Sequence, residues 1–162
     1  MNFTYEIASH ETLAKIGDKN IANHPGDERW VRWMNEALED DARGWRKTFL
    51  VCADGEPVGE GTLLFSTECK AVHGVTAIAD GAASTNVNAL RIEKRFEGQG
   101  HISRLMRMME QYAKDAGYKT ITIGVEACET RNLAIYLHWG YRKLVHWELD
   151  EGELVLYYAK EL

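Results

Sequence analysis

Hydrophobic and polar positions alternate over some stretches of this chain and recur every three or four residues over others. Residues 3–7 alternate, which predicts a short strand. The clearest helical pattern starts directly after Gly100, and Gly117 stands where a left-handed cap ends such a helix. Its apolar or small positions are Ile102, Leu105, Met106, Met109, Tyr112, Ala113 and Ala116. The following segment, 118–125, is rich in β-branched residues and predicts a buried strand.

The other predicted elements complete an α/β (α+β) pattern. They follow in this order: a helix capped by Ser9, a helix capped by Asp27, strands over 48–53, 57–65 and 87–93, a helix over 131–139, and strands over 142–149 and 154–160. Asp54-Gly55 is a strong hairpin signal, and 66–86 reads as part strand, part mobile loop. This order predicts one domain over 1–162, with a mixed, mostly antiparallel central sheet and helices on both faces.

Composition places the chain among ordinary globular proteins. It has 162 residues, 45% of them hydrophobic and 27% charged, which is typical of a soluble domain. No apolar run reaches the roughly 18 residues of a transmembrane helix, and the start lacks the pattern of a signal peptide. We therefore expect a cytoplasmic protein without membrane contact.

Charge and cysteine usage exclude further classes. The formal net charge of −6 argues against a nucleic-acid partner and mildly favours a cationic small substrate. The cysteines Cys52, Cys69 and Cys128 are widely spaced, which suits a reducing compartment. No pair has zinc-ligand spacing and no His-x-x-x-His occurs, so we expect no metal.

The sharpest candidate for chemistry is Gly98-Gln99-Gly100, which lies between a predicted strand and the long helix. Backbone N–H groups at such a helix start can hold a phosphate. A tight turn without a ligand uses the same residues. The common nucleotide fingerprints fail, because no Gly-Lys-Ser/Thr follows and Ser103 stands at the third glycine position.

Over its whole element order, and most sharply from Leu90 to Tyr141, the chain resembles the GNAT superfamily of acyl-CoA-dependent N-acetyltransferases. The signature of this family is [QR]-x-x-G-x-[GA] at a helix start. Residues 95–100, Arg-Phe-Glu-Gly-Gln-Gly, satisfy the written pattern. The distance from the preceding strand favours the register 97–102 instead, in which Glu97 and Ile102 depart from the family. A second match is the helix that ends in L-Y-x-x-x-G-[FY].

In that second match Tyr136 and Gly140-Tyr141 fit the frame, with Ile135 in the place of the leucine. Glu129 and Asn132 stand where the family usually has Asn and Ala. The resemblance implies that acetyl-CoA is the acyl donor. Its phosphates would meet the backbone of Glu97, Gly98, Gln99, Gly100, His101, Ile102 and Ser103.

The resemblance also assigns the pantetheine arm and the thioester. The backbone of Leu90, Arg91 and Ile92 would pair with pantetheine, and the N–H of Ile92 would meet the thioester carbonyl. Asn132 would bond the pantetheine or adenosine side, or it caps its helix. Tyr136 would donate a proton to the departing thiolate, or it only packs and hydrogen-bonds CoA.

The general base and the acceptor pocket are less narrowly defined. Glu93 and Glu126 end two neighbouring strands that splay apart in the family, and either carboxylate could take a proton through water. The alternative for each is a surface glutamate at a strand end. Trp33 and Trp147 are expected in the acceptor pocket, which the family builds from the first helices and the last hairpin.

The leading hypothesis is transfer of an acetyl group from acetyl-CoA to a primary amine of a small molecule or peptide, by direct attack in a ternary complex. A catalytically weak CoA-binding sensor or interaction module is the alternative. A protein without a CoA site, in which the glycines only shape a turn, is the third. Members of the family often dimerise through their C-terminal strands, so a homodimer is one expected assembly.

Overall fold

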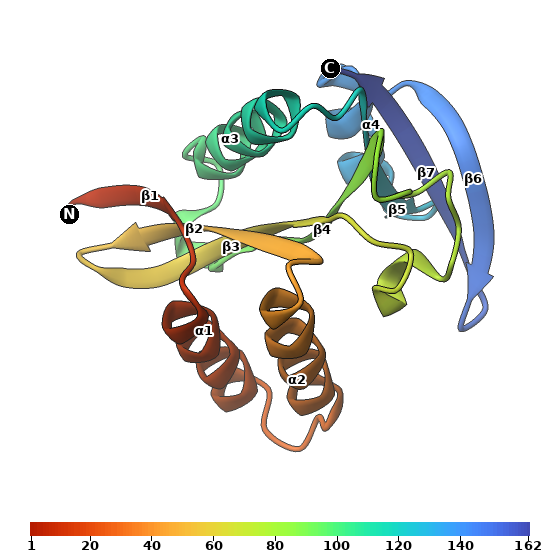
Figure 1. Cartoon of the computed structure of the whole chain (residues 1–162). Helices are drawn as coiled ribbons and strands as arrows, with labels where there is room; N and C mark the ends of the chain where they lie inside the picture. Colours follow the sequence, from red (N-terminus) through yellow and green to blue (C-terminus); the bar gives the residue numbers. More distant parts are fainter. The chain divides into compact units, whose positions relative to one another are not determined.

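The computed structural model describes residues 1–162 and contains seven strands and four α-helices (Figure 1). The elements are β1 Phe3–Ile7, α1 His10–Asn23, α2 Arg29–Ala42, β2 Arg46–Ala53, β3 Glu56–Leu64, β4 Ser84–Ile92, α3 His101–Asp115, β5 Thr120–Glu126, α4 Thr130–His138, β6 Lys143–Asp150 and β7 Glu153–Glu161. Backbone hydrogen bonds link the strands in the order β1-β2-β3-β4-β5-β7-β6. The predicted element order and the mixed sheet are confirmed.

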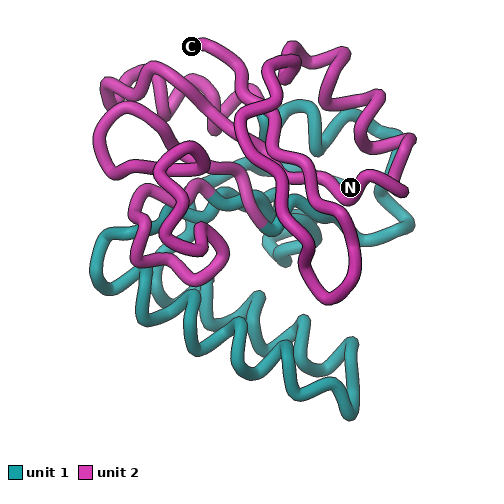
Figure 2. The backbone as a smooth tube through the Cα atoms, turned by 90° about the vertical axis from the view of Figure 1, so that its right-hand side faces the viewer, with its two compact units in different colours: residues 1–62, 89–106 teal, residues 63–88, 107–162 magenta.

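The chain divides into two compact units (Figure 2). The first, unit 1, consists of residues 1–62 and 89–106, and the second, unit 2, of residues 63–88 and 107–162. Strands β3 and β4 and helix α3 each pass from one unit to the other along the chain.

In unit 1 helices α1 and α2 lie against β2. The buried core there consists of Leu13, Ile16, Ala37, Leu50 and Cys52. Helix α1 begins as predicted, because the Ser9 hydroxyl accepts the N–H of Thr12 at 3.1 Å. Side chains of β1 pack against Phe96 and against the first residue of α3. Phe3 packs edge-on against Phe96, with ring centroids 5.4 Å apart, and lies 4.3 Å from the ring of His101.

Two turns of unit 1 test the sequence-based interpretation of turns and caps. Asp54 and Gly55 both have positive φ, 48° and 85°, as a two-residue hairpin of type I′ requires, so this prediction is confirmed. The predicted cap Asp27 is one residue too early, because Glu28 is the N-cap of α2. The Asp27 carboxylate instead binds the guanidinium of Arg29 and also accepts its backbone N–H at 3.2 Å. This bonding lowers the pKa of Asp27 to about 2.

Unit 2 combines parallel and antiparallel pairing. Strand β5 runs parallel to β4 and antiparallel to β7, which also pairs with β6. Gly124 lies so close to Tyr157 that an added Cβ would be 2.8 Å from its ring. The expected mobile loop in 66–86 is anchored, because Ile78 is fully buried and the Asp80 carboxylate accepts three backbone N–H groups.

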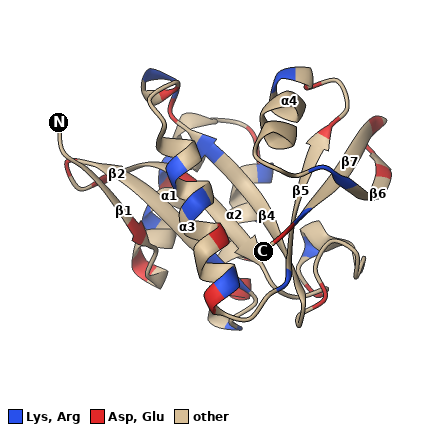
Figure 3. Ribbon diagram, turned by 90° about the horizontal axis from the view of Figure 1, so that it is seen from above, with Lys and Arg blue, Asp and Glu red and all other residues tan.

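Helix α3 buries its apolar residues, among them Leu105, Met106 and Met109. Figure 3 shows basic and acidic residues mixed along α3, whose sequence contains both signs. None of the helices combines the length and the apolar character that crossing a bilayer requires.

Candidate functional site: the glycine loop, the end of β4 and a charged cavity

The glycine loop between β4 and α3 is exposed and open above its backbone. Phe96 is buried and anchors the loop, whereas residues 97–100 are exposed. Gly98 and Gly100 have φ of +73° and +85°, and a Cβ at either position would meet nothing within 4 Å. Glycine is therefore required by backbone conformation rather than by crowding inside the protein. The open space beside both residues is what a phosphate needs to approach the backbone.

Helix α3 begins immediately after this loop. The N–H of Arg104 bonds to the carbonyl of Gly100 at 3.1 Å, and the N–H groups before it belong to the helix start, where no intrahelical acceptor exists. His101 is only 7% exposed, and its Nδ1 lies 2.6 Å from the Tyr5 hydroxyl. That contact fixes the first turn of α3 against β1, so the helix N-terminus, whose dipole favours an anion, is held in one position.

The arginines near the loop are already engaged. Arg95 pairs with Glu93 at 3.0 Å and lies over the ring of Phe96. Arg104 lies 4.0 Å over the ring of Tyr5. Gln99 donates its side-chain amide to the carbonyl of Arg95 at 3.3 Å, which closes the loop on itself. The acidic side chain of Glu97 is exposed.

The end of β4 is irregular in a way that frees backbone donors. Parallel pairing with β5 ends at Val87, opposite Ile123, although β4 continues to Ile92. Ala89 has a positive φ of 53°, which bends the strand. Beyond the bend, Glu93 donates its N–H to the carbonyl of Val58 on β3 at 2.9 Å. Successive N–H groups of a strand alternate in direction, so the N–H of Ile92 points away from β3.

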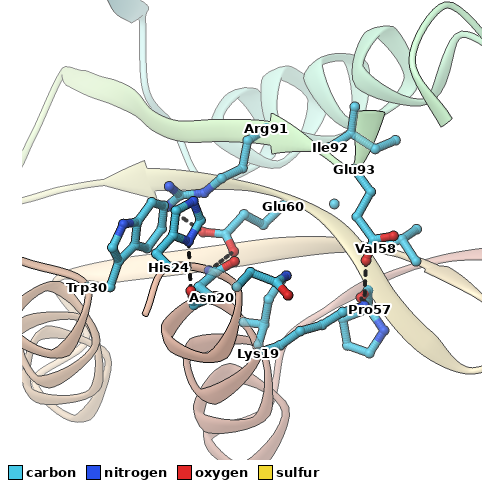
Figure 4. Close-up of a pocket in the computed structure, with 13 residues that line it drawn as sticks. Lys19, Asn20, His24, Trp30, Pro57, Val58, Glu60, Arg91, Ile92 and Glu93 are labelled. Carbon is cyan, nitrogen blue, oxygen red and sulfur yellow. Dashed lines mark hydrogen bonds and ion pairs between the residues drawn. The ribbon is translucent and has the colours of Figure 1, made fainter. Parts of the chain in front are cut away.

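A cavity of about 250 Å³ lies in unit 1 beside this strand end (Figure 4). Helix α1, the first residues after it, α2, β3 and the end of β4 all contribute. Its lining residues are Ile16, Lys19, Asn20, Asn23, His24, Trp30, Pro57, Val58, Gly59, Glu60, Arg91, Ile92 and Glu93.

One end of the cavity is built around the buried carboxylate of Glu60, which is 5% exposed. Arg91 donates to it at 3.1 Å and the side-chain amide of Asn20 at 3.3 Å. The guanidinium of Arg91 also lies 4.7 Å over the ring of Trp30. His24 stacks on that ring at 4.0 Å and donates Nδ1–H to the carbonyl of Asn20. Each polar side chain named here makes at least one hydrogen bond, although the Nε of Arg91 has no partner.

The other end holds the predicted base Glu93. Its carboxylate lies 2.6 Å from the ammonium of Lys19, which also donates to the carbonyl of Pro57 at 2.7 Å. Partial burial acts to raise the pKa of Glu93, but the hydrogen bonds from Lys19 and Arg95 outweigh it and lower the pKa below its usual value. The group is therefore ionised at neutral pH and holds a proton weakly.

Three residues predicted for catalysis or acetyl-CoA binding belong to unit 2. Burial and the neighbouring Glu129 raise the pKa of Tyr136 in α4, so its phenol keeps its proton at neutral pH. Asn132 does not cap the helix, because Glu129 is the N-cap and accepts the Asn132 amide at 3.0 Å. Glu126 ends β5 and accepts a weak hydrogen bond from Cys128 at 3.7 Å.

The two tryptophans expected in the acceptor pocket do not line this cavity. Trp33 is 39% exposed and packs edge-on against Trp30, which does line it. Trp147 lies on β6 and is 60% exposed. Sequence reasoning missed Glu60 altogether. The signal available in the sequence was a carboxylate between two glycines, Gly59 and Gly61, in a strand of the predicted hairpin.

Comparison with known proteins identifies the family. The sequence model of the acetyltransferase (GNAT) family matches residues 7–141. The chain belongs to the GNAT family. GNAT acetyltransferases use acetyl-CoA as acyl donor, and the exposed glycine loop at the start of α3 fits its phosphates. No curated protein sequence matches the chain.

Solved GNAT structures share the fold. The PaiA N-acetyltransferase from Thermoplasma acidophilum, in complex with coenzyme A, has a TM-score of 0.65 at 13% identity and covers 100% of both chains. A GNAT acetyltransferase from Elizabethkingia anophelis with acetyl-CoA bound has a TM-score of 0.61 at 18% identity, and the match covers 99% of both chains. An N-acetyltransferase from Staphylococcus aureus has a TM-score of 0.66 at 16% identity, and the match again covers 99% of both chains. At these identities the likeness establishes the GNAT fold.

Proposed function

We propose that the chain transfers an acetyl group from acetyl-CoA to a primary amine of a small molecule or a peptide, by direct attack in a ternary complex. The observation that carries the proposal is the open backbone at Gly98 and Gly100, directly before α3, in a member of the GNAT family. The cavity beside the end of β4 gives an acceptor a place within the same unit.

Backbone groups would do most of the acetyl-CoA binding. The loop from Glu97 to Ser103 would donate N–H groups to the phosphates. Leu90, Arg91 and Ile92 would pair with the pantetheine arm, and the outward N–H of Ile92 would donate to the carbonyl that becomes an oxyanion. Acetyl-CoA supplies the acyl group as a thioester when bound. Asn132 would bond to its pantetheine or adenosine side.

Tyr136 is the proposed proton donor to the departing sulfur. Its raised pKa keeps the phenol protonated at neutral pH, as a donor requires. A phenylalanine keeps the ring and removes only the hydroxyl. Tyr136→Phe should lower kcat about 10²-fold, the lower end of the range for a lost acid or base, while the Kd for acetyl-CoA changes little.

Glu93 and Glu126 are the two candidates for the general base. Glu93 lies in the cavity wall, but its lowered pKa makes it a weak base. We assign Glu93 to binding the incoming ammonium, with the proton leaving through water. Glu126 at the end of β5 is the other candidate, and the kinetics of Glu126→Gln and Glu93→Gln distinguish the two roles. Substitution of the base should lower kcat most steeply, whereas substitution of an ammonium-binding group should chiefly raise KM.

The first experiment is thermal unfolding with acetyl-CoA and with ATP as an anion control. A ligand present at 100 times its Kd stabilises the folded state by about 2.7 kcal/mol, which should raise Tm by roughly 5–11 °C for a chain of this size. Thiol release with a panel of primary amines then measures turnover. Tyr158→Phe is the matched control for Tyr136→Phe, because no role is assigned to that hydroxyl.

The outcomes separate the hypotheses. Stabilisation by acetyl-CoA alone, with amine-dependent thiol release, is the expected result. Stabilisation without release for any amine would favour the CoA-binding module, for which the acidic Glu97 beside the loop is an argument. No stabilisation by either ligand would leave Gly98 and Gly100 as a turn and overturn the proposal.

A further inference from the structure

The cavity of unit 1 contains both signs of charge, and this composition bears on the substrate. Two cations, Lys19 and Arg91, and two anions, Glu60 and Glu93, line it, so the lining carries no net charge. A cavity selective for a bare ammonium would carry an excess of carboxylates. The formal net charge of the whole chain is −6, which does not predict this balance in the cavity.

Arg91 is the residue with unused capacity. Its side chain donates to Glu60 and stacks on Trp30, which fixes the guanidinium plane. Its side chain is 40% exposed and lines the cavity, although its Nε is buried and has no hydrogen-bond partner. The guanidinium nitrogens that a ligand can reach are therefore the terminal ones, and a carboxylate oxygen is the acceptor that they bind best. The guanidinium is thus preorganised to bind an anionic group of a ligand.

Glu93 follows two residues later, directly after β4 ends at Ile92, and it lines the same cavity. Two residues of extended backbone span about 6.6 Å. A ligand that places an ammonium at Glu93 and a carboxylate at Arg91 therefore needs its two charged groups a few ångströms apart. The ammonium end would then lie next to Ile92, whose N–H is the proposed contact of the thioester carbonyl.

We infer that the acceptor is an amine that also carries a carboxylate on the same or an adjacent carbon, the α-amino acids being the simplest members of the class. The inference rests on the proposed function, because it names the substrate of the same site. It assigns Arg91 to the substrate carboxylate and Glu93 to the substrate ammonium. An internal peptide lysine has no such carboxylate and falls outside the class.

The test uses the wild-type chain and matched pairs of ligands. Each of the common α-amino acids is compared with the amine that lacks its carboxylate, for example phenylalanine with phenethylamine and methionine with 3-(methylthio)propylamine. Direct binding is measured by calorimetry without acetyl-CoA, and kcat/KM by thiol release with it. We expect at least one amino acid to bind and react at least tenfold better than its matched amine.

A variant pair then assigns the preference to Arg91. Arg91→Lys keeps the charge beside Glu60 and removes the planar edge, so it should reduce the preference for the carboxylate at least fivefold. Arg43→Lys is the matched control, because Arg43 also lies 4.7 Å over a tryptophan ring, that of Trp45, and pairs with a glutamate, Glu39. This control should retain the wild-type preference.

Two results would overturn the inference. One is matched amines that bind and react as well as the amino acids; the other is no binding by any amino acid of the panel. Neither result touches the proposed function, which is judged by acetyl-CoA binding and by turnover with any primary amine. Conversely, amino-acid binding with no acetyl transfer would support the cavity assignment and refute the enzyme.

Discussion

Gly100 offers the sharpest test of the phosphate loop, because the chain contains a matched control. Gly100 and Gly152 have nearly the same φ, +85° and +84°, and at both an added Cβ would meet no atom within 4 Å. Gly100 precedes α3, whereas Gly152 lies in the turn between β6 and β7. Alanine at either position is forced into the left-handed region, which costs about 1–2 kcal/mol.

The two variants should therefore lose similar stability and differ in ligand binding. For a chain of this size 1–2 kcal/mol lowers Tm by roughly 2–8 °C. Only Gly100→Ala places a methyl group where a phosphate would approach the backbone, so the Kd for acetyl-CoA should rise at least tenfold, which is about 1.4 kcal/mol. Differential scanning calorimetry measures the first quantity and titration calorimetry the second. Equal affinity of Gly100→Ala and Gly152→Ala for acetyl-CoA would refute the phosphate-loop interpretation.

Three further predictions concern the scaffold. Ser9→Ala removes the side-chain cap of α1 and should cost about 1 kcal/mol in urea unfolding; an unchanged midpoint would contradict the capping role. Gly124→Ala would press a Cβ against the ring of Tyr157 and should destabilise by about 1–3 kcal/mol, which calorimetry can test. Hydrogen bonds from backbone N–H groups, that of Ser84 first, lower the pKa of Asp80 below 3.8, so the stability it adds is present above that pH and is lost as pH falls further. The difference between wild type and Asp80→Asn in urea unfolding should therefore shrink below pH 3.8, and a constant difference would contradict it.

Local chemistry made the element order predictable. The hairpin at Asp54-Gly55, the cap at Ser9 and the glycine after α3 each require a particular residue at a particular backbone conformation, and the sequence displays those residues. The start of β4 was placed too late, at 87 instead of Ser84. Thr85 and Asn86 are polar yet buried, because Thr85 donates to the carbonyl of Leu64 and Asn86 to the hydroxyl of Thr122. A strand pattern based on apolar residues overlooks such a network.

One part of the candidate site could be predicted from the sequence and another part could not. The glycine loop was found because its residues are adjacent in sequence. The cavity was not, because its charged lining comes from segments far apart in the chain, such as Lys19, Glu60 and Arg91. Helix periodicity also does not decide between Trp30 and Trp33. In the structure Trp30, on which His24 stacks, lines the cavity, and Trp33 does not.

The division of the chain into units has a consequence for synthesis. Unit 1 comprises residues 1–62 and 89–106, with a segment of unit 2 between them. The charged cavity draws Lys19 from the first segment and Glu93 from the second. During translation, the helices and the hairpin of the first segment emerge well before the strand that completes their unit. A nascent chain released short of residue 93 therefore has neither the cavity nor the loop, and its folding is completed only by residues synthesised after part of unit 2.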